Sequence, residues 1–159
     1  DFILQTFAQA NEIGESDQVL YYYLQNDNSA MRIFNAERIN CLELMYKRGE
    51  WLKTKTPSFS KQFSQWFVSR LYWSVLWQAC ASLETYSDFS EFAKLTSAKE
   101  HISKLKDYPN KQIKTSSFVF LHFPKLYWII VRSASKNKHI QKSNFEEISC
   151  RLKTLKVSI

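Results

Sequence analysis

Cysteine and histidine are the residues of this chain best suited to metal or redox chemistry, and their spacing decides whether they can act together. They lie far apart along the chain, at Cys41, Cys80, His101, His122, His139 and Cys150. Zinc sites and disulfide frameworks show closely spaced pairs such as Cys-x-x-Cys, and no such pair occurs here. The sequence therefore predicts reduced, buried thiols in a cytosolic protein and no metal site. A glycine-rich phosphate loop and an Asp-x-Asp pair are also absent from it.

Positive charge is concentrated in the second half of the chain. Residues 1–93 hold 8 Lys and Arg against 11 Asp and Glu, whereas residues 94–159 hold 14 against 4, a net charge of +10. A basic region with interleaved aromatic residues suits an anionic partner, either membrane lipid or nucleic acid. The cations predicted to meet an anionic surface are Lys136, Lys138, Lys142, Lys153 and Lys156. The alternative is a solvated face, because single-sign faces often only keep a protein in solution.

The longest apolar stretch, residues 58–84, is predicted to form the helix on which the others pack. Only a thin polar stripe at helical spacing interrupts it, so it should be buried on most sides. Trp73 and Trp77 are expected in its core. Lys61 and Arg70 interrupt the stretch, which is too short to be read as a membrane span. Docking on a partner or a membrane is the alternative role for this helix.

The rest of the chain also follows helical patterns. We predict a mainly α fold, a bundle of five or six helices around residues 58–84, preceded by one short strand at Val19–Tyr23. Capping signals of the form Asp-x-x-Glu and Ser-x-x-Glu mark two helix starts, at Asp88 and at Ser143. The other helices are expected at residues 1–11, 35–53, 88–106, 124–135 and 143–155.

Two features of the basic half are typical of proteins that lie on a membrane. Residues 117–131 supply ring types that favour a membrane interface, namely Phe118, Phe120, Phe123, Tyr127 and Trp128. The final helix adds an apolar stripe flanked by lysines, a pattern found in helices that lie in the interface plane. The competing interpretation is that this stripe packs on the central helix.

The first 31 residues carry an order of elements that matches a known family. Asp1 and Phe2 begin a helix, Val19–Tyr23 form a strand ending in tyrosines, and Asn28–Met31 close a polar segment. This arrangement resembles the end of the catalytic domain of family 2 glycosyltransferases of the GT-A type. The resemblance implies that residues 1–31 end such a domain and that residues 32–159 form a C-terminal helical domain. Leu24, Gln25 and Asn26 replace the Arg or His that family members often carry after the tyrosines.

The resemblance implies that Asp1 is the carboxylate that takes the proton from the attacking acceptor hydroxyl, or the immediate neighbour of that base. An aspartate at a helix start is also a common cap. Ser29 and Tyr23 would contact substrate, although a turn serine and a tyrosine packed in the core explain them equally well. A divalent ion, Mg²⁺ or Mn²⁺, would be held by an Asp-x-Asp motif upstream of this chain, so the chain itself is expected to bind no cofactor.

The expected function is therefore that of the C-terminal portion of a bacterial glycosyltransferase. The parent would move a sugar from a nucleotide-sugar donor to a cell-surface glycan of the capsule or lipopolysaccharide type, or to a lipid-linked acceptor, at the cytoplasmic face of the inner membrane. The helical part would dock acceptor or membrane, or form a homodimer, and would be inactive alone. The alternatives are a non-enzymatic dimerisation module and, last, a nucleic-acid binder, because no helix-turn-helix or zinc signature is present.

Overall fold

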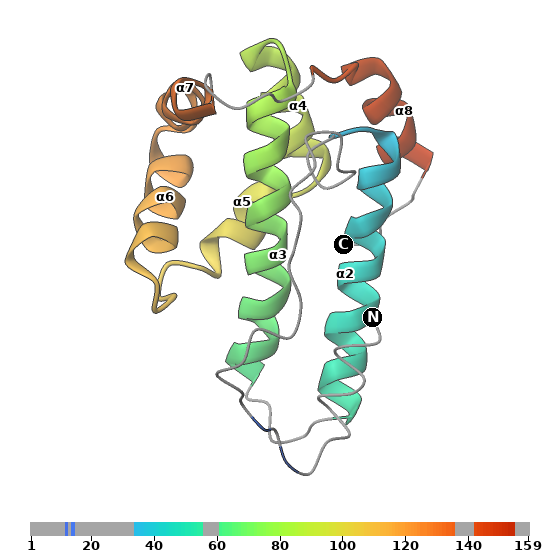
Figure 1. Cartoon of the computed structure of the whole chain (residues 1–159), viewed down its shortest axis with the longest axis vertical. Coiled ribbons are helices and arrows are strands. Elements are labelled where there is room, and N and C mark those ends of the chain that lie inside the picture. Colours follow the sequence, from blue (N-terminus) through green and yellow to red (C-terminus); the bar gives the residue numbers. More distant parts are fainter. Residues whose placement is uncertain (1–11, 13, 15–33, 56–60, 136–141, 155–159) are drawn as a thin grey trace.

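The structure is a computed structural model that describes residues 12, 14, 34–55, 61–135 and 142–154. These residues form seven helices and no strand (Figure 1). The helices are α2 (Ala36–Lys55), α3 (Lys61–Ser82), α4 (Tyr86–Leu95), α5 (Ala98–Ser103), α6 (Lys111–His122), α7 (Pro124–Ser135) and α8 (Phe145–Thr154). The predicted mainly α class is confirmed. The strand expected at Val19–Tyr23 and the helix expected at residues 1–11 lie outside the described residues.

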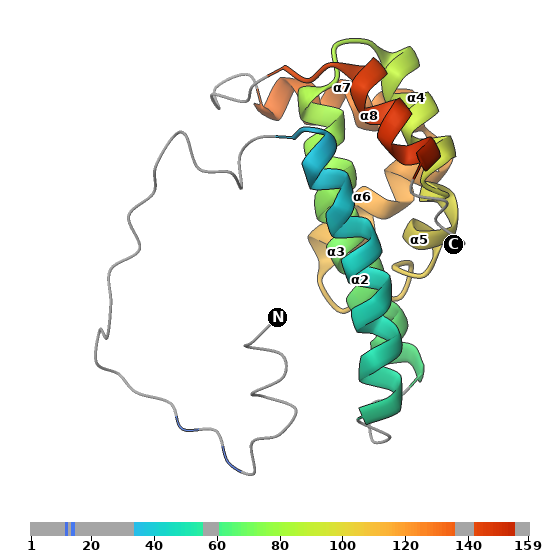
Figure 2. The ribbon, with the colours of Figure 1, turned by 90° about the vertical axis from the view of Figure 1, so that its right-hand side faces the viewer.

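The two longest helices, α2 and α3, lie side by side (Figures 1 and 2). Asn35 caps α2, because its side-chain oxygen accepts a hydrogen bond from the Arg38 amide at 3.0 Å. Gly49 on α2 lies against Val68 on α3. A Cβ atom at this position would lie only 2.5 Å from Cγ2 of Val68. The missing side chain of Gly49 thus lets α2 pack directly on α3.

The buried face of α3 carries Tyr72, Leu76, Ala79 and Cys80, each 1% exposed or less. This helix contacts α2, α4, α5 and α7. Trp73 and Trp77 do not lie in the core as expected, because both are only partly buried at its edge. The indole nitrogen of Trp73 instead donates to the hydroxyl of Ser116 on α6 at 2.8 Å.

The helix predicted at residues 88–106 is broken into α4 and α5. Thr85, not Asp88, caps α4, because its hydroxyl accepts from the Asp88 amide at 3.1 Å. Ser97 breaks the helix by adopting a left-handed conformation with φ of 51°, a region that costs a residue with a side chain free energy. The chain therefore turns between α4 and α5, and both helices pack on α3.

The α6–α7 hairpin packs on α3 on the side away from α2 (Figure 1). Asn110 caps α6, and its side-chain oxygen accepts from the Ile113 amide at 3.1 Å. Pro124 begins α7, where its missing amide hydrogen is not needed. The helix predicted from Pro124 to about Ser135 is confirmed with these bounds.

The last helix, α8, packs on α2 and α4 rather than on the central helix. Asn144 supplies its cap by accepting from the Glu146 amide at 3.0 Å. Ser143, which the sequence suggested as the cap, instead donates from its hydroxyl to the Phe34 carbonyl just before α2. α8 is thereby fixed to the end of the bundle where α2 begins and α3 ends.

Candidate functional site

The residues assigned to substrate by the resemblance lie outside the described part of the chain. This holds for Asp1, Tyr23 and Ser29, and also for three of the cations predicted to meet an anionic surface, Lys136, Lys138 and Lys156. Lys142 and Lys153 are described, and both are exposed. The ammonium of Lys142 lies 2.8 Å from the Glu84 carboxylate, and this pairing lowers the pKa of Glu84.

The described cysteines and histidines lie in unlike surroundings. Cys80 is buried and its pKa is raised by desolvation, whereas Cys150 is exposed and Cys41 is half-buried. His101 is buried in the core between α2, α3 and α5. Within the described ranges, no three His, Cys, Asp or Glu residues come together as metal ligands would.

The apolar stripe of α8 packs in the interior of the protein. Ile148 and Leu152 are buried, on a helix that packs on α2 and α4. Arg151, on the exposed side of α8, donates two hydrogen bonds to the side-chain oxygen of Asn40 on α2, at 2.8 and 2.9 Å. The described part of this stripe therefore packs inside the protein, as the competing interpretation expected, although it packs on α2 and α4 rather than on the central helix.

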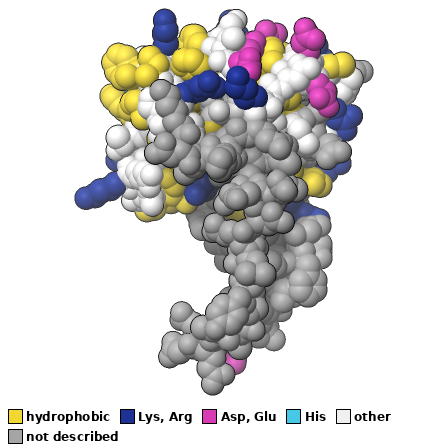
Figure 3. Space-filling model, turned by 45° about the horizontal axis from the view of Figure 1, so that its top comes forward, with side chains coloured by type: hydrophobic (Ala, Val, Ile, Leu, Met, Phe, Trp, Pro, Cys, Tyr) yellow, Lys and Arg dark blue, Asp and Glu magenta, His cyan; other side chains and the backbone are white. Residues whose placement is uncertain are grey.

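Among the residues that the structure describes, the α6–α7 hairpin exposes the largest group of apolar side chains. Five of them, which we call the α6–α7 apolar surface, are each about half exposed: Phe118 (57%), Phe123 (56%), Leu126 (47%), Ile129 (48%) and Ile130 (51%). In Figure 3, hydrophobic side chains gather on the left of the molecule, the side on which Figure 1 places α6 and α7. Exposed apolar side chains gathered on one side of a molecule mark a place where a protein meets a partner or a membrane.

This exposure follows from the spacing of apolar residues in α7. Tyr127 and Val131 are buried, while Leu126, Ile129 and Ile130 occupy the opposite face at helical spacing. A helix that is apolar on both faces can bury only one of them in the core. The other face of α7 is left exposed.

The rings expected at a membrane interface divide into two groups. Phe120 and Tyr127 are in the core, and Trp128 is half-buried beneath the guanidinium of Arg132, which lies 5.3 Å from its ring centre. Only Phe118 and Phe123 are exposed. The aliphatic residues of α7, which the sequence interpretation did not single out, contribute the larger share of the apolar surface.

The charged side chains of the segment that forms the α6–α7 apolar surface have one sign. Residues 108–145 contain no Asp or Glu, but they do contain Lys111, Lys114, Lys125, Arg132, Lys136, Lys138 and Lys142. Lys111 and Lys114 on α6 and Lys125 on α7 are exposed. Arg132 differs from them, because it donates to the Leu83 carbonyl at 2.5 Å and so belongs to the packing of α3 on α7.

None of the described helices is long and apolar enough to cross a lipid bilayer. Comparison of the chain with protein-family models, with curated proteins and with solved structures gives no match. The resemblance to family 2 glycosyltransferases therefore stays a prediction that rests on residues 1–31. The described geometry concerns the helical remainder, whose most distinctive feature is an apolar surface rimmed by lysines.

Proposed function

We propose that this chain is the C-terminal helical part of a GT-A type glycosyltransferase, and that its α6–α7 apolar surface docks the enzyme on an anionic membrane. The observation that carries the docking role is the exposure of five large apolar side chains within a segment that has cations and no carboxylates. The glycosyltransferase assignment is supported only by the sequence pattern of residues 1–31.

The free energies expected from burying the apolar side chains and from attracting the lysines fit reversible docking on a membrane. Full burial of a large apolar side chain is worth about 1.5–3 kcal/mol, so five half-exposed side chains supply roughly half of that each on insertion. A lysine near an anionic leaflet adds about 1 kcal/mol. The two terms together are enough to hold a protein on a surface without a spanning helix.

A second copy of the chain is a poorer occupant of this surface. In a two-fold symmetric dimer the same patch faces itself. Lys111, Lys114 and Lys125 would then approach their own copies, and like charges brought together at an interface oppose association. An anionic bilayer accepts the apolar side chains and neutralises the lysines at the same time.

Nucleic acid fits the charge but not the apolar side chains. Protein surfaces that bind phosphate backbones are polar and strongly basic, and Leu126, Ile129 and Ile130 would gain little from such a partner. The aliphatic face of α7 is the feature that favours lipid.

Vesicle co-sedimentation tests the docking role. The chain should bind phosphatidylglycerol vesicles, should fail to bind phosphatidylcholine vesicles, and should be released as salt is raised, because screening shortens the reach of the lysines. Replacing Phe118 and Ile129 by Ser should lower the bound fraction several-fold. Leu44→Ser is the matched control, because Leu44 is 57% exposed but lies on α2.

Charge is tested with paired double variants of equal net charge. Lys114→Glu with Lys125→Glu should weaken binding, while Lys106→Glu with Lys153→Glu, placed elsewhere on the surface, should weaken it much less. Equal loss in both pairs would mean that only net charge matters. A concentration-dependent dimer that Phe118→Ser abolishes, with no vesicle binding, would overturn the membrane role in favour of self-association.

The catalytic assignment has its own test. The resemblance places the donor-binding half upstream, so calorimetry of this chain with nucleotide-sugars and Mn²⁺ should show no binding. A micromolar dissociation constant would show that a donor site is complete within these residues and would contradict the assignment of residues 1–31 to the end of a catalytic domain.

A further inference from the structure

A cleft of about 510 Å³ opens between α4, α5 and the junction of α6 with α7. We call it the α4–α5 pocket. Its size lies within the range of 300–1,000 Å³ typical of small-molecule sites. It is distinct from the α6–α7 apolar surface, although Pro124 at the start of α7 lines it.

The walls of the α4–α5 pocket are mainly apolar. Six such residues line it: Tyr86, Phe89, Ala93, Ala98, Phe120 and Pro124. The rings of Phe89 and Phe120 meet edge to face with centres 6.3 Å apart, and Tyr86 lies 6.5 Å from Phe89. Tyr86, Phe89 and Ala93 recur at helical spacing, so one face of α4 forms a continuous wall.

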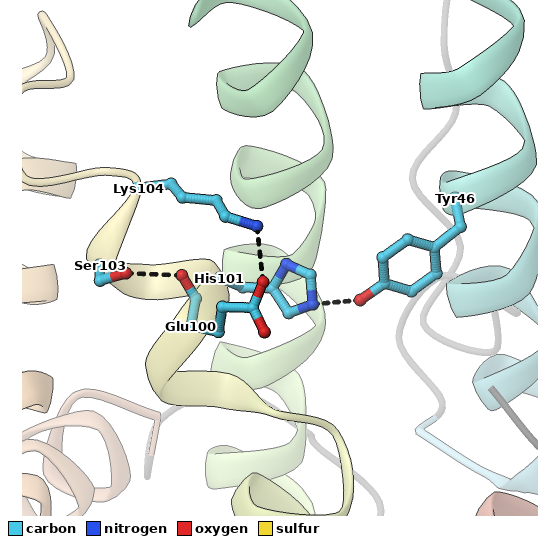
Figure 4. Close-up of polar contacts among 5 residues, drawn as sticks. All are labelled: Tyr46, Glu100, His101, Ser103 and Lys104. Carbon is cyan, nitrogen blue, oxygen red and sulfur yellow. Dashed lines mark hydrogen bonds and ion pairs between the residues drawn. The ribbon is translucent and has the colours of Figure 1, made fainter. Parts of the chain in front are cut away.

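Two lysines lie at the edge of this cleft. Lys94 at the end of α4 and Lys99 in the first turn of α5 both line it, and both are exposed. The left-handed turn at Ser97 brings the two helices together so that both lysines border one cleft. Glu100, a carboxylate among the lining residues, already pairs with Lys104 at 3.0 Å (Figure 4), which offsets its charge.

We propose that the α4–α5 pocket binds the hydrocarbon chain of an anionic amphiphile, with its carboxylate or phosphate headgroup held by Lys94 and Lys99. The apolar walls suit a chain and offer few donors to a sugar or a nucleotide. The long aliphatic stems of the two lysines can cover the chain while their ammonium groups reach the headgroup. This inference goes beyond the membrane docking proposed above and does not depend on it.

A spin-labelled fatty acid tests the proposal directly. The probe is 16-doxyl-stearate, used below its micelle concentration at pH 8 so that its carboxylate is ionised. In amide NMR spectra of the whole chain, it should broaden the signals of Ala93, Ala98 and Phe120. Broadening confined to Phe118, Leu126 and Ile129, or no broadening at all, would overturn the proposal.

Variants test the headgroup contact without disturbing the core. Lys94→Glu with Lys99→Glu should weaken stearate binding at least tenfold, whereas Lys106→Glu with Lys153→Glu should leave it unchanged. A labelled lysophosphatidylcholine, which is zwitterionic, should bind at least tenfold more weakly than stearate. Equal affinities in either comparison would overturn the role of the two lysines.

Ala93→Trp tests the cleft itself. The larger side chain should fill the cleft and remove stearate binding, and the amide spectrum of the variant reports whether the fold is kept.

A separate measurement shows whether the amphiphile comes from a bilayer or is free in solution. Broadening of Ala93, Ala98 and Phe120 by labelled chains in phosphatidylglycerol vesicles identifies a bilayer lipid, and broadening by monomeric stearate alone identifies a free amphiphile. Either result supports the pocket. Stearate binding without vesicle binding would contradict only the docking role of α6–α7, and vesicle binding without broadening in the pocket would contradict only the inference made here.

Discussion

The hydroxyl of Tyr46 on α2 hydrogen-bonds Nε2 of His101 on α5 (Figure 4). This contact joins two helices through residues that are 55 positions apart in the sequence. The imidazole is 2% exposed and stacks on the ring of Tyr72, whose centre lies 4.6 Å away. His101 is thus a buried neutral side chain that links α2, α3 and α5.

Stability should fall as the pH is lowered from 7 to 5, because of His101. Burial lowers its pKa from 6.5 to about 4, with Lys104 acting in the same direction and Glu100 opposing it. Between these two values the unfolded chain binds a proton that the folded protein excludes, so acid favours unfolding. Linkage then gives a loss of about 2 kcal/mol between pH 7 and pH 5. Urea unfolding at a series of pH values measures it.

His101→Gln serves as the control for this pH dependence. The variant should be less stable at pH 7, but it lacks the titrating group, so its free energy of unfolding should change much less between pH 7 and pH 5. The lowered pKa values of Glu43, Glu84 and Glu100 act below this window. Identical slopes in the two proteins would show that His101 is not responsible.

Two substitutions at Tyr72 should separate the contribution of its ring to stability from that of its hydroxyl. Its side chain is 1% exposed, and its hydroxyl forms a hydrogen bond of 2.5 Å with that of Thr96. Tyr72→Phe should cost about 1 kcal/mol for the lost bond, and Tyr72→Ala about 3–5 kcal/mol for the cavity. Chemical denaturation measures both. Trp73→Ala should cost less than Tyr72→Ala, because Trp73 is only partly buried, and the reverse order would contradict this account of the core.

Gly49→Ala should destabilise the protein although alanine favours helices. The higher helix propensity of alanine over glycine should stabilise α2 by about 1 kcal/mol. The added Cβ would meet Cγ2 of Val68 at 2.5 Å, and a β-branched side chain cannot easily rotate away. Overpacking of this kind typically costs about 1–3 kcal/mol, so the two terms leave a net loss of up to about 2 kcal/mol.

A double-mutant cycle isolates this contact. Val68→Ala removes the obstructing methyl, so Gly49→Ala should be neutral or stabilising in that background. A Gly49→Ala variant that raises the melting temperature of the otherwise unchanged protein would show that α2 and α3 are further apart than described.

The sequence predicts where helices begin and end better than it predicts which face of each helix is buried. Pro124 and Asn35 mark helix starts through local chemistry, and both were found. Trp73 and Trp77 were misplaced, and the exposed Leu126, Ile129 and Ile130 were not singled out. α3 and α7 are apolar on more than one face, so periodicity cannot tell which face meets neighbours that are distant in the sequence. The break at Ser97 was missed because a left-handed serine leaves no pattern of residue types.

Thr85 and Asp88 both match the pattern of a cap at the start of α4, and substitutions at the two residues distinguish them. In the structure the hydroxyl of Thr85 accepts from the Asp88 amide, and the Thr85 carbonyl accepts from the Phe89 amide at 3.2 Å. Thr85→Ala should therefore cost about 1 kcal/mol. Asp88→Ala removes only a favourable charge near the helix N-terminus and should cost less.

The cap matters because α4 carries Phe89 and Phe92 into the core, so fraying of its first turn loosens buried rings. Thr115→Ala, at an exposed position in the middle of α6, is the matched control and should be nearly neutral. Urea unfolding of the three variants ranks them. If Asp88→Ala proves more damaging than Thr85→Ala, the helix begins at Asp88 as the sequence pattern suggested, and the break between α4 and α5 must be reconsidered with it.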